Sequence, residues 1–368
     1  MYALNLISIK LLRLLVPLVQ RSYTPRSSQE PPKPDASTSF PSPSPQAGAS
    51  SRRINASIYL PSPNPSPTST VIALPIIINL HGSGFCFHSF GDDASFCHYL
   101  ATALTAVIID VDYSHAPERP WPAAVEDVDA AINWAREFAR IGRKSRKANG
   151  PILGPDGKPE WEWDENRIAL TGFSSGGNLA LVASTRSQQN GGVQAVVAFY
   201  PSTNLAEPAN KKPQLSPDPG AAGGVIPPWM RNLFYSSYIP SSVAPDRKDP
   251  AISPLYATPS SFPPSVTVIT CEKDSLAREG GHLIGKLRGR WAPEGSEPNS
   301  AEVYKGDSLL WTAKGQGHGW DKMVREGTEP ARLKDEAYAL TVKRLGACFA
   351  KVAVGHDDEM ERDLRDDS

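Results

Sequence analysis

The stretch RIALTGFSSGGNLAL, residues 167–181, gives the clearest indication of a fold. It begins with a short apolar run, continues with small residues from Gly172 to Gly177, and ends with the composition of a buried helix. One interpretation is a tight strand-to-helix turn, in which glycines supply the backbone angles and serine only caps the helix. The other is a Gly-x-Ser-x-Gly elbow, in which a strained turn lifts the Ser174 hydroxyl clear of a sheet as a nucleophile. This stretch alone leaves both open.

Apolar runs of strand length alternate with helix-like segments through most of the chain. Each run is rich in β-branched residues and continuous enough to be buried on both faces. The most distinct helix-like segment, 122–140, begins with proline, which suits a first helical turn. This alternation predicts an α/β fold with a mostly parallel central sheet flanked by helices. The expected strands lie in 71–80, 106–113, 167–172, 193–201 and 265–274, with an edge strand in 52–61.

The composition excludes several classes of partner. Lys and Arg number 38 against 39 Asp and Glu, so the formal net charge is -1 and no basic face for nucleic acid is indicated. The four cysteines are far apart and form no CxxC pair, so neither a zinc site nor a disulfide framework is expected, and no cofactor is implied. Such cysteines fit a reducing compartment, so we expect a cytoplasmic protein. The sequence does not indicate the oligomeric state.

The N-terminal part differs from the rest. Residues 1–26 are apolar and basic, but Arg13 and Pro17 interrupt the apolar run, which argues against a membrane-spanning helix. Three interpretations stay open: a mitochondrial targeting peptide, a helix in peripheral contact with a membrane, and a helix that covers part of the main domain. The expected parts are an N-terminal segment with a Pro/Ser-rich linker over 1–51, a main domain over 52–355 and a charged tail over 356–368.

One interval interrupts the alternation of strands and helices. Residues 202–250 are rich in Pro, Gly and Ser and contain the aromatic run PPWMRNLFYSSYI at 227–239. A surface insertion would explain this, but the apolar area favours a cap over a pocket. Phe85, Trp229 and Phe234 are the residues that we expect to line that pocket.

An acyl-transfer site built on Ser174 needs a base and an acid that orients it. Among seven histidines, His318 lies in the glycine-rich loop KGQGHGWDK, where an imidazole can reach over a sheet edge. Glu272 and Asp274 follow the carboxyl end of a buried strand, where catalytic groups of open α/β sheets gather. We favour Asp274 as the acid and keep Glu272 as its rival. The order Ser174, Asp274, His318 is the order that an α/β-hydrolase requires.

Donors for an oxyanion are expected from NLHGSGFCF, residues 79–87. Small side chains there let backbone N–H groups face an anion. Ser83 and Gly84, together with Ser175 at the start of the following helix, would form a three-donor hole. A metal site at His81 is not expected, because no second ligand lies at a usable spacing in the sequence.

Several motifs together resemble the hormone-sensitive-lipase branch of α/β-hydrolases over roughly residues 71–325. The resemblance implies an esterase whose nucleophile, acid and base are Ser174, Asp274 and His318. The chain differs from the branch at three positions: it has Ser83 where Gly is usual, Phe173 where Asp is usual and Ser175 where Ala is usual. Two connections, 143–166 and 291–320, also look longer than is usual in the branch. The motifs are HGSGF, YSHAPERPWPAAVEDVDAAINW, GFSSGGN, DPAISPLYA, PPSVTVITCEKDSLAREG and GHGW.

The leading hypothesis is a serine carboxylesterase that cleaves short- to medium-chain or aryl esters through an acyl-enzyme intermediate, without metal or organic cofactor. An amide or formamide deacylase with the same site is an alternative, because both reactions pass through a tetrahedral intermediate. A small-ligand receptor is another, since the branch includes plant hormone receptors that lack the catalytic histidine. The retained His318 argues against the receptor.

Overall fold

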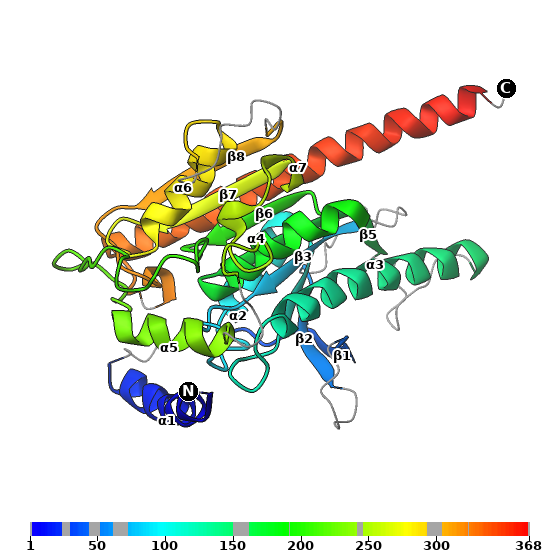
Figure 1. Ribbon diagram of the computed structural model, residues 1–368. Coiled ribbons are helices and arrows are strands. Elements are labelled where there is room, and N and C mark those ends of the chain that lie inside the picture. The colour runs from blue at the N-terminus through cyan, green and yellow to red at the C-terminus, as the bar shows by residue number, and fades with distance from the viewer. Residues whose placement is uncertain are drawn as a thin grey trace.

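The core of the protein is an eight-stranded sheet in the order β1-β2-β4-β3-β5-β6-β7-β8 (Figure 1). The computed structural model describes residues 2–23, 30–43, 52–61, 73–149, 162–190, 192–240, 246–292, 304–322 and 324–366. β1 and β2 pair antiparallel with their neighbours, and all other pairs are parallel. The strands are β1 (Ala36–Pro41), β2 (Arg53–Tyr59), β3 (Ala73–Leu80), β4 (Val107–Asp112), β5 (Glu162–Phe173), β6 (Ala195–Phe199), β7 (Ser265–Cys271) and β8 (Asp307–Ala313).

Helices cover both faces of this sheet. One apolar core contains side chains of α3, α4 and α6, and the other contains side chains of α2 and α7. Every residue of β6 and β7 is buried, because these β-branched runs have a helix layer on each side. The α/β prediction is confirmed. The helices are α1 (Tyr2–Tyr23), α2 (Ala94–Leu104), α3 (Ala123–Asn149), α4 (Ser175–Arg186), α5 (Pro228–Tyr238), α6 (Ala277–Leu287) and α7 (Glu329–Asp366), with 3-10 turns at Ser187–Asn190, Pro254–Tyr256, Pro259–Ser261 and Trp320–Lys322.

The expected domain boundary at residue 52 is wrong. β1 pairs with β2 as the edge strand of the sheet, and α1 lies beside α5 (Figure 1). Ile9 of α1 is fully buried, and the Arg13 guanidinium donates hydrogen bonds to the carbonyls of Cys86 and Ala116 and pairs with Glu118. The helix therefore covers part of the domain, as one of the three interpretations held. Among the described residues, no helix combines the length and hydropathy needed to cross a bilayer.

The insertion between β6 and β7 contains α5 and is fixed to the domain by a buried ion pair. Lys212 pairs with Glu279 of α6, and both side chains are almost fully buried. Removing charges from water is costly unless they are paired, so this contact holds the insertion in one position.

Two predictions fall partly outside the described residues. They are the long connections at 143–166 and 291–320. The expected charged tail is helical to Asp366, because α7 continues through it.

Candidate active site

The backbone turns sharply at Ser174, between β5 and α4. Ser174 has φ 52° and ψ −114°, a conformation that L residues seldom adopt. Glycine is required on both sides of it. A Cβ on Gly172 would lie 2.3 Å from the carbonyl oxygen of Gly176, and one on Gly176 would lie 2.0 Å from the carbonyl oxygen of Leu80. The small residues therefore serve an elbow that projects Ser174 from the end of the strand.

The three residues expected from distant parts of the chain meet at this elbow. His318 Nε2 lies 2.9 Å from Ser174 Oγ, and His318 Nδ1 lies 2.7 Å from Asp274 Oδ2. The Asp274 carboxylate is buried and accepts a hydrogen bond from the N–H of Leu276 through its other oxygen. This chain of contacts can pass a proton from a hydroxyl to an imidazole that a carboxylate orients.

The rival acid lies elsewhere. Glu272 has a 40 % exposed side chain and accepts a hydrogen bond of 2.9 Å from the N–H of Gly315. That N–H is the main reason why the pKa of Glu272 lies below its ordinary value. Glu272 therefore supports the loop that carries His318 and does not contact the imidazole.

The loop of His318 is held by residues that the sequence did not indicate. Gly317 and His318 donate backbone hydrogen bonds to Ala222 and Gly224 of the insertion. The Tyr200 ring packs edge-on against the imidazole, with ring centroids 4.8 Å apart, and its hydroxyl donates to Asp321. The imidazole is therefore fixed on its backbone side and on one ring face.

Ser83 does not fit its expected role as an oxyanion donor. Its N–H already donates to Ser175 Oγ at 2.9 Å, and its hydroxyl lies 2.8 Å from the Tyr113 hydroxyl. Tyr113 in turn donates to the carbonyl of His81 at 2.7 Å. Ser83 is thus part of a buried hydroxyl network behind the loop. Within the described residues, the N–H groups of Gly84 and Ser175 have no such acceptor.

The expected pocket residues divide into two groups. Phe85 is buried and stacks on Tyr238 of α5, with ring centroids 3.9 Å apart. Phe234 lies so close to the oxyanion loop that a Cβ on Gly84 would be 2.6 Å from its ring. Trp229 is 57 % exposed, so its prediction as a covered pocket residue is wrong. It lies off the helix face that is buried at Arg231, Phe234, Tyr235 and Tyr238.

A buried polar cluster lies beneath the same end of the sheet. The Asn79 side chain donates to Asp93 at 3.0 Å and to Asp110 at 2.9 Å. Burial, followed by the nearby Asp93 charge, raises the pKa of Asp110 to about 7. Lys322 pairs with Asp93 at 2.6 Å. The Lys322 ammonium and the Asn79 amide thus hold the side chains of Asp93 and Asp110 in the core.

The chain has relatives among known proteins. A family described as alpha/beta hydrolase fold matches residues 77–306. The chain belongs to this family. Esterase LipI of Mycobacterium tuberculosis is 34 % identical over 131 residues, which are 35 % of either chain. Bovine hormone-sensitive lipase is 31 % identical over 143 residues, 38 % of this chain and 16 % of the lipase, in agreement with the resemblance noted in the motifs.

The fold of this α/β hydrolase recurs in solved structures. A hyperthermophilic esterase from Pyrobaculum calidifontis superposes with a TM-score of 0.62 at 24 % identity, over 92 % of this chain and 93 % of that one. By contrast, the chain spans only about a third of LipI and a sixth of the bovine lipase in sequence.

Proposed function

We propose that this α/β hydrolase cleaves carboxylic esters through an acyl-enzyme intermediate on Ser174. The observation that carries the proposal is the continuous contact from Ser174 Oγ through His318 to the buried Asp274. The names of the relatives, an esterase and a lipase, support the same reaction class. A receptor is disfavoured, because His318 is present and contacts the hydroxyl directly.

The proposed reaction has two halves. Ser174 Oγ attacks the ester carbonyl while His318 Nε2 accepts its proton, and the protonated imidazole then donates that proton to the leaving alcohol. Water, deprotonated by the same nitrogen, releases the acid and restores the serine. Asp274 holds the ring and stabilises its charged form. The N–H groups of Gly84 and Ser175 are the proposed donors to the oxyanion.

The proposed substrates are short- to medium-chain or aryl esters. Two aromatic rings bring apolar surface to the oxyanion loop: Phe85, which directly follows Gly84 and stacks on Tyr238 of α5, and Phe234 of α5, which lies against Gly84. Each acyl methylene that fits contributes about 0.8 kcal/mol, until the space is full. The Ser83 hydroxyl does not contribute to this limit, because it bonds to Tyr113 rather than facing an acyl chain.

A p-nitrophenyl ester series from acetyl to palmitoyl tests this function. We expect kcat/KM to rise to butyryl or hexanoyl and then fall, and to drop about 1,000-fold or more in Ser174→Ala. Matched p-nitroanilides report on the amidase alternative. Near-normal ester turnover by Ser174→Ala would contradict the mechanism, and a continuous rise to palmitoyl would contradict the size limit alone.

We further propose that the outer face of α1 binds an anionic membrane surface. The first 29 residues hold no acidic residue, and three of their four basic residues, Lys10, Arg21 and Arg26, are left to complement anionic lipid because Arg13 pairs with Glu118. An apolar helix face flanked by cations is the pattern of interfacial helices. Its side chains that are more than half exposed are Leu4, Ile7, Leu11, Leu14 and Leu15.

A further inference from the structure

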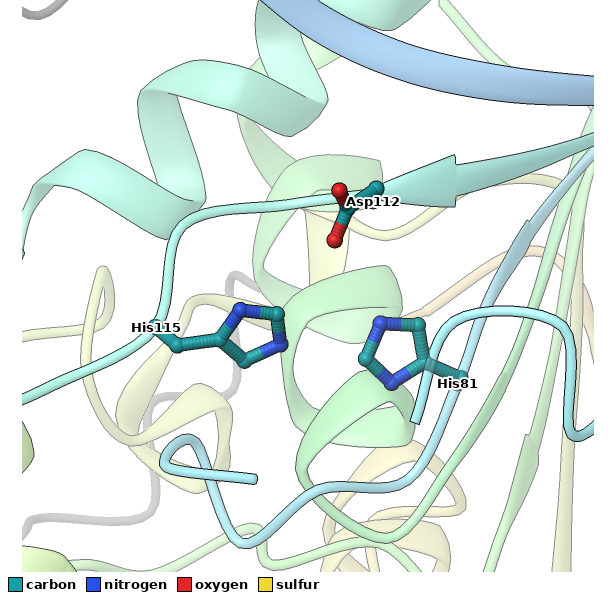
Figure 2. A group of neighbouring side chains, drawn as sticks. All are labelled: His81, Asp112 and His115. Carbon is teal, nitrogen blue, oxygen red and sulfur yellow. The ribbon is translucent and has the colours of Figure 1, made fainter. Parts of the chain in front are cut away.

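Two histidines and an aspartate meet beside the oxyanion loop, outside the machinery described above. His81 directly follows β3, Asp112 ends β4, and His115 lies three residues later. Because β3 and β4 are neighbouring parallel strands, their carboxyl ends bring these residues to one sheet edge. One ligand atom from each lies within 4.8 Å of the others. Figure 2 shows the two rings side by side, with the carboxylate directed toward the space between them.

Three ring nitrogens of this cluster have no hydrogen-bond partner within the described residues. His81 is fully buried, yet neither of its ring nitrogens has a hydrogen-bond partner in the described part of the chain, and the same holds for Nε2 of the buried His115. Buried polar atoms are normally satisfied, and each one that is not destabilises the fold. The ring centroids are 5.4 Å apart with planes tilted by 24°, so the two rings are roughly parallel and offset from one another. A shared ligand between their edges would satisfy both.

The charge state of the cluster suits a cation. Both imidazoles are buried, and burial favours the neutral form of an imidazole, which offers lone pairs to a metal ion. The Asp112 carboxylate, half-buried, supplies the negative charge and accepts a hydrogen bond from Asn55 at 3.3 Å, as ligating carboxylates commonly do.

The nearest cations do not cancel that charge. Arg13 pairs with Glu118 and Arg52 pairs with Asp127, so each guanidinium already has its own carboxylate. His88, which is exposed, packs edge-on against His115 with centroids 4.8 Å apart. Arg52 also donates a hydrogen bond of 3.1 Å to the backbone carbonyl of Asp112, which leaves the Asp112 carboxylate to the cluster. The cluster lies near solvent on the side of His88.

We propose that His81, Asp112 and His115 bind one divalent transition-metal ion, of which Zn²⁺ is the best match. Two imidazoles and one carboxylate are ligands that zinc accepts and that magnesium and calcium disfavour. Tetrahedral ligands at zinc distances lie about 3.3 Å apart, so the residues must close inward by an ångström or so. His115 lies in a loop, which can make that adjustment.

We assign the ion a structural role, because none of its three ligands belongs to the proposed triad of Ser174, Asp274 and His318. Its first ligand precedes the loop with Gly84, and the His81 carbonyl accepts the hydrogen bond from Tyr113 that anchors the buried hydroxyl network. Zinc would therefore fix the oxyanion loop from behind. The proposal does not depend on the proposed esterase reaction, because metal binding is measured without any substrate.

Calorimetric titration of the chelator-treated full-length protein with Zn²⁺ tests the site, with the visible spectrum of Co²⁺ as a second readout. We expect one ion per chain and a tetrahedral Co²⁺ spectrum. Asp112→Asn and His115→Leu should each weaken Zn²⁺ binding at least about tenfold. His98→Ala, which removes an exposed histidine of α2, is the matched control and should bind as the parent does.

Two results would overturn the proposal. The first is the lack of saturable Zn²⁺ binding by the parent protein. The second is binding that survives either ligand substitution, or that the control loses, since the ion would then bind to other groups. Circular dichroism of each variant shows that it is folded, and a zinc-dependent rise in the melting temperature of the parent, lost in both ligand variants, gives an independent measure.

Discussion

The backbones of Gly224 and His318 are joined by two hydrogen bonds, one in each direction and both 2.9 Å long. Gly224 belongs to the insertion after β6, and His318 is the proposed base. The insertion therefore contacts the backbone of the proposed base and helps to set the position of its imidazole. A shift of about 1 Å in a catalytic group can cost 100-fold in rate, so this pairing is expected to matter for activity.

Gly223→Ala tests the role of the pairing. Gly223 has φ 88°, and a Cβ there would lie 2.4 Å from the carbonyl oxygen of Gly317, so the His318 loop must move. We expect kcat to fall about tenfold or more. Gly220→Ala is the matched control, since Gly220 has φ 79° but open space around its Cβ position. Equal losses in the two variants would assign the effect to backbone strain alone.

Ser175→Ala tests the corrected oxyanion assignment. The Ser175 hydroxyl accepts the N–H of Ser83 behind the oxyanion loop, so its removal leaves the proposed backbone donors of Gly84 and Ser175 in place. We expect kcat in ester hydrolysis to stay within about twofold of the parent value. Ser184→Ala, at another buried serine of α4, should leave kcat unchanged. A large fall in Ser175→Ala would show that the hydroxyl network holds the loop in place.

Asp110 should make stability depend on pH. Its pKa is about 7 in the folded protein and near 4 when unfolded, so the folded state holds the proton more tightly. The free energy of unfolding should therefore fall as pH rises from 4 to 7. Asp110→Asn cannot lose a proton and so removes this pH dependence. The free energy of unfolding of the variant, relative to that of the parent, should therefore increase by up to about 4 kcal/mol between pH 4 and pH 7. Urea denaturation at several pH values measures both free energies of unfolding. A difference between the two proteins that does not change with pH would contradict the raised pKa of Asp110.

The membrane proposal is tested by co-sedimentation with vesicles that contain phosphatidylserine. The double variant Leu11→Glu with Leu14→Glu should bind about tenfold more weakly than the parent. The control is Phe138→Glu with Ile141→Glu, which makes the same charge change at exposed apolar residues of α3. If both double variants lose vesicle binding equally, the net charge of the protein determines that binding, and the proposed role of the outer face of α1 is contradicted.

The sequence predicted the parts of this protein that local patterns determine. The buried strands and α3 followed from apolar runs, and Ser174 followed from glycines whose steric need is local. β1 was missed because ASTSFP is a polar edge strand with little apolar pattern.

Contacts between distant segments could not be predicted in the same way. The approach of His81 to His115 follows from the pairing of β3 with β4, whereas their separation of 34 positions gives no metal-binding signature. The bond between the Ser83 N–H and Ser175 Oγ likewise depends on how two loops pack, so a family pattern of backbone donors did not reveal it.

The central claim is that Ser174 is a nucleophile activated by His318 and Asp274. Labelling with a fluorophosphonate, followed by mass spectrometry of the peptides, tests it most directly. We predict a single adduct on Ser174, formed at the parent rate in Glu272→Gln and slowed by about 10,000-fold in Asp274→Asn. An adduct on a different residue, no adduct on the folded protein, or rapid labelling of Asp274→Asn would contradict the account.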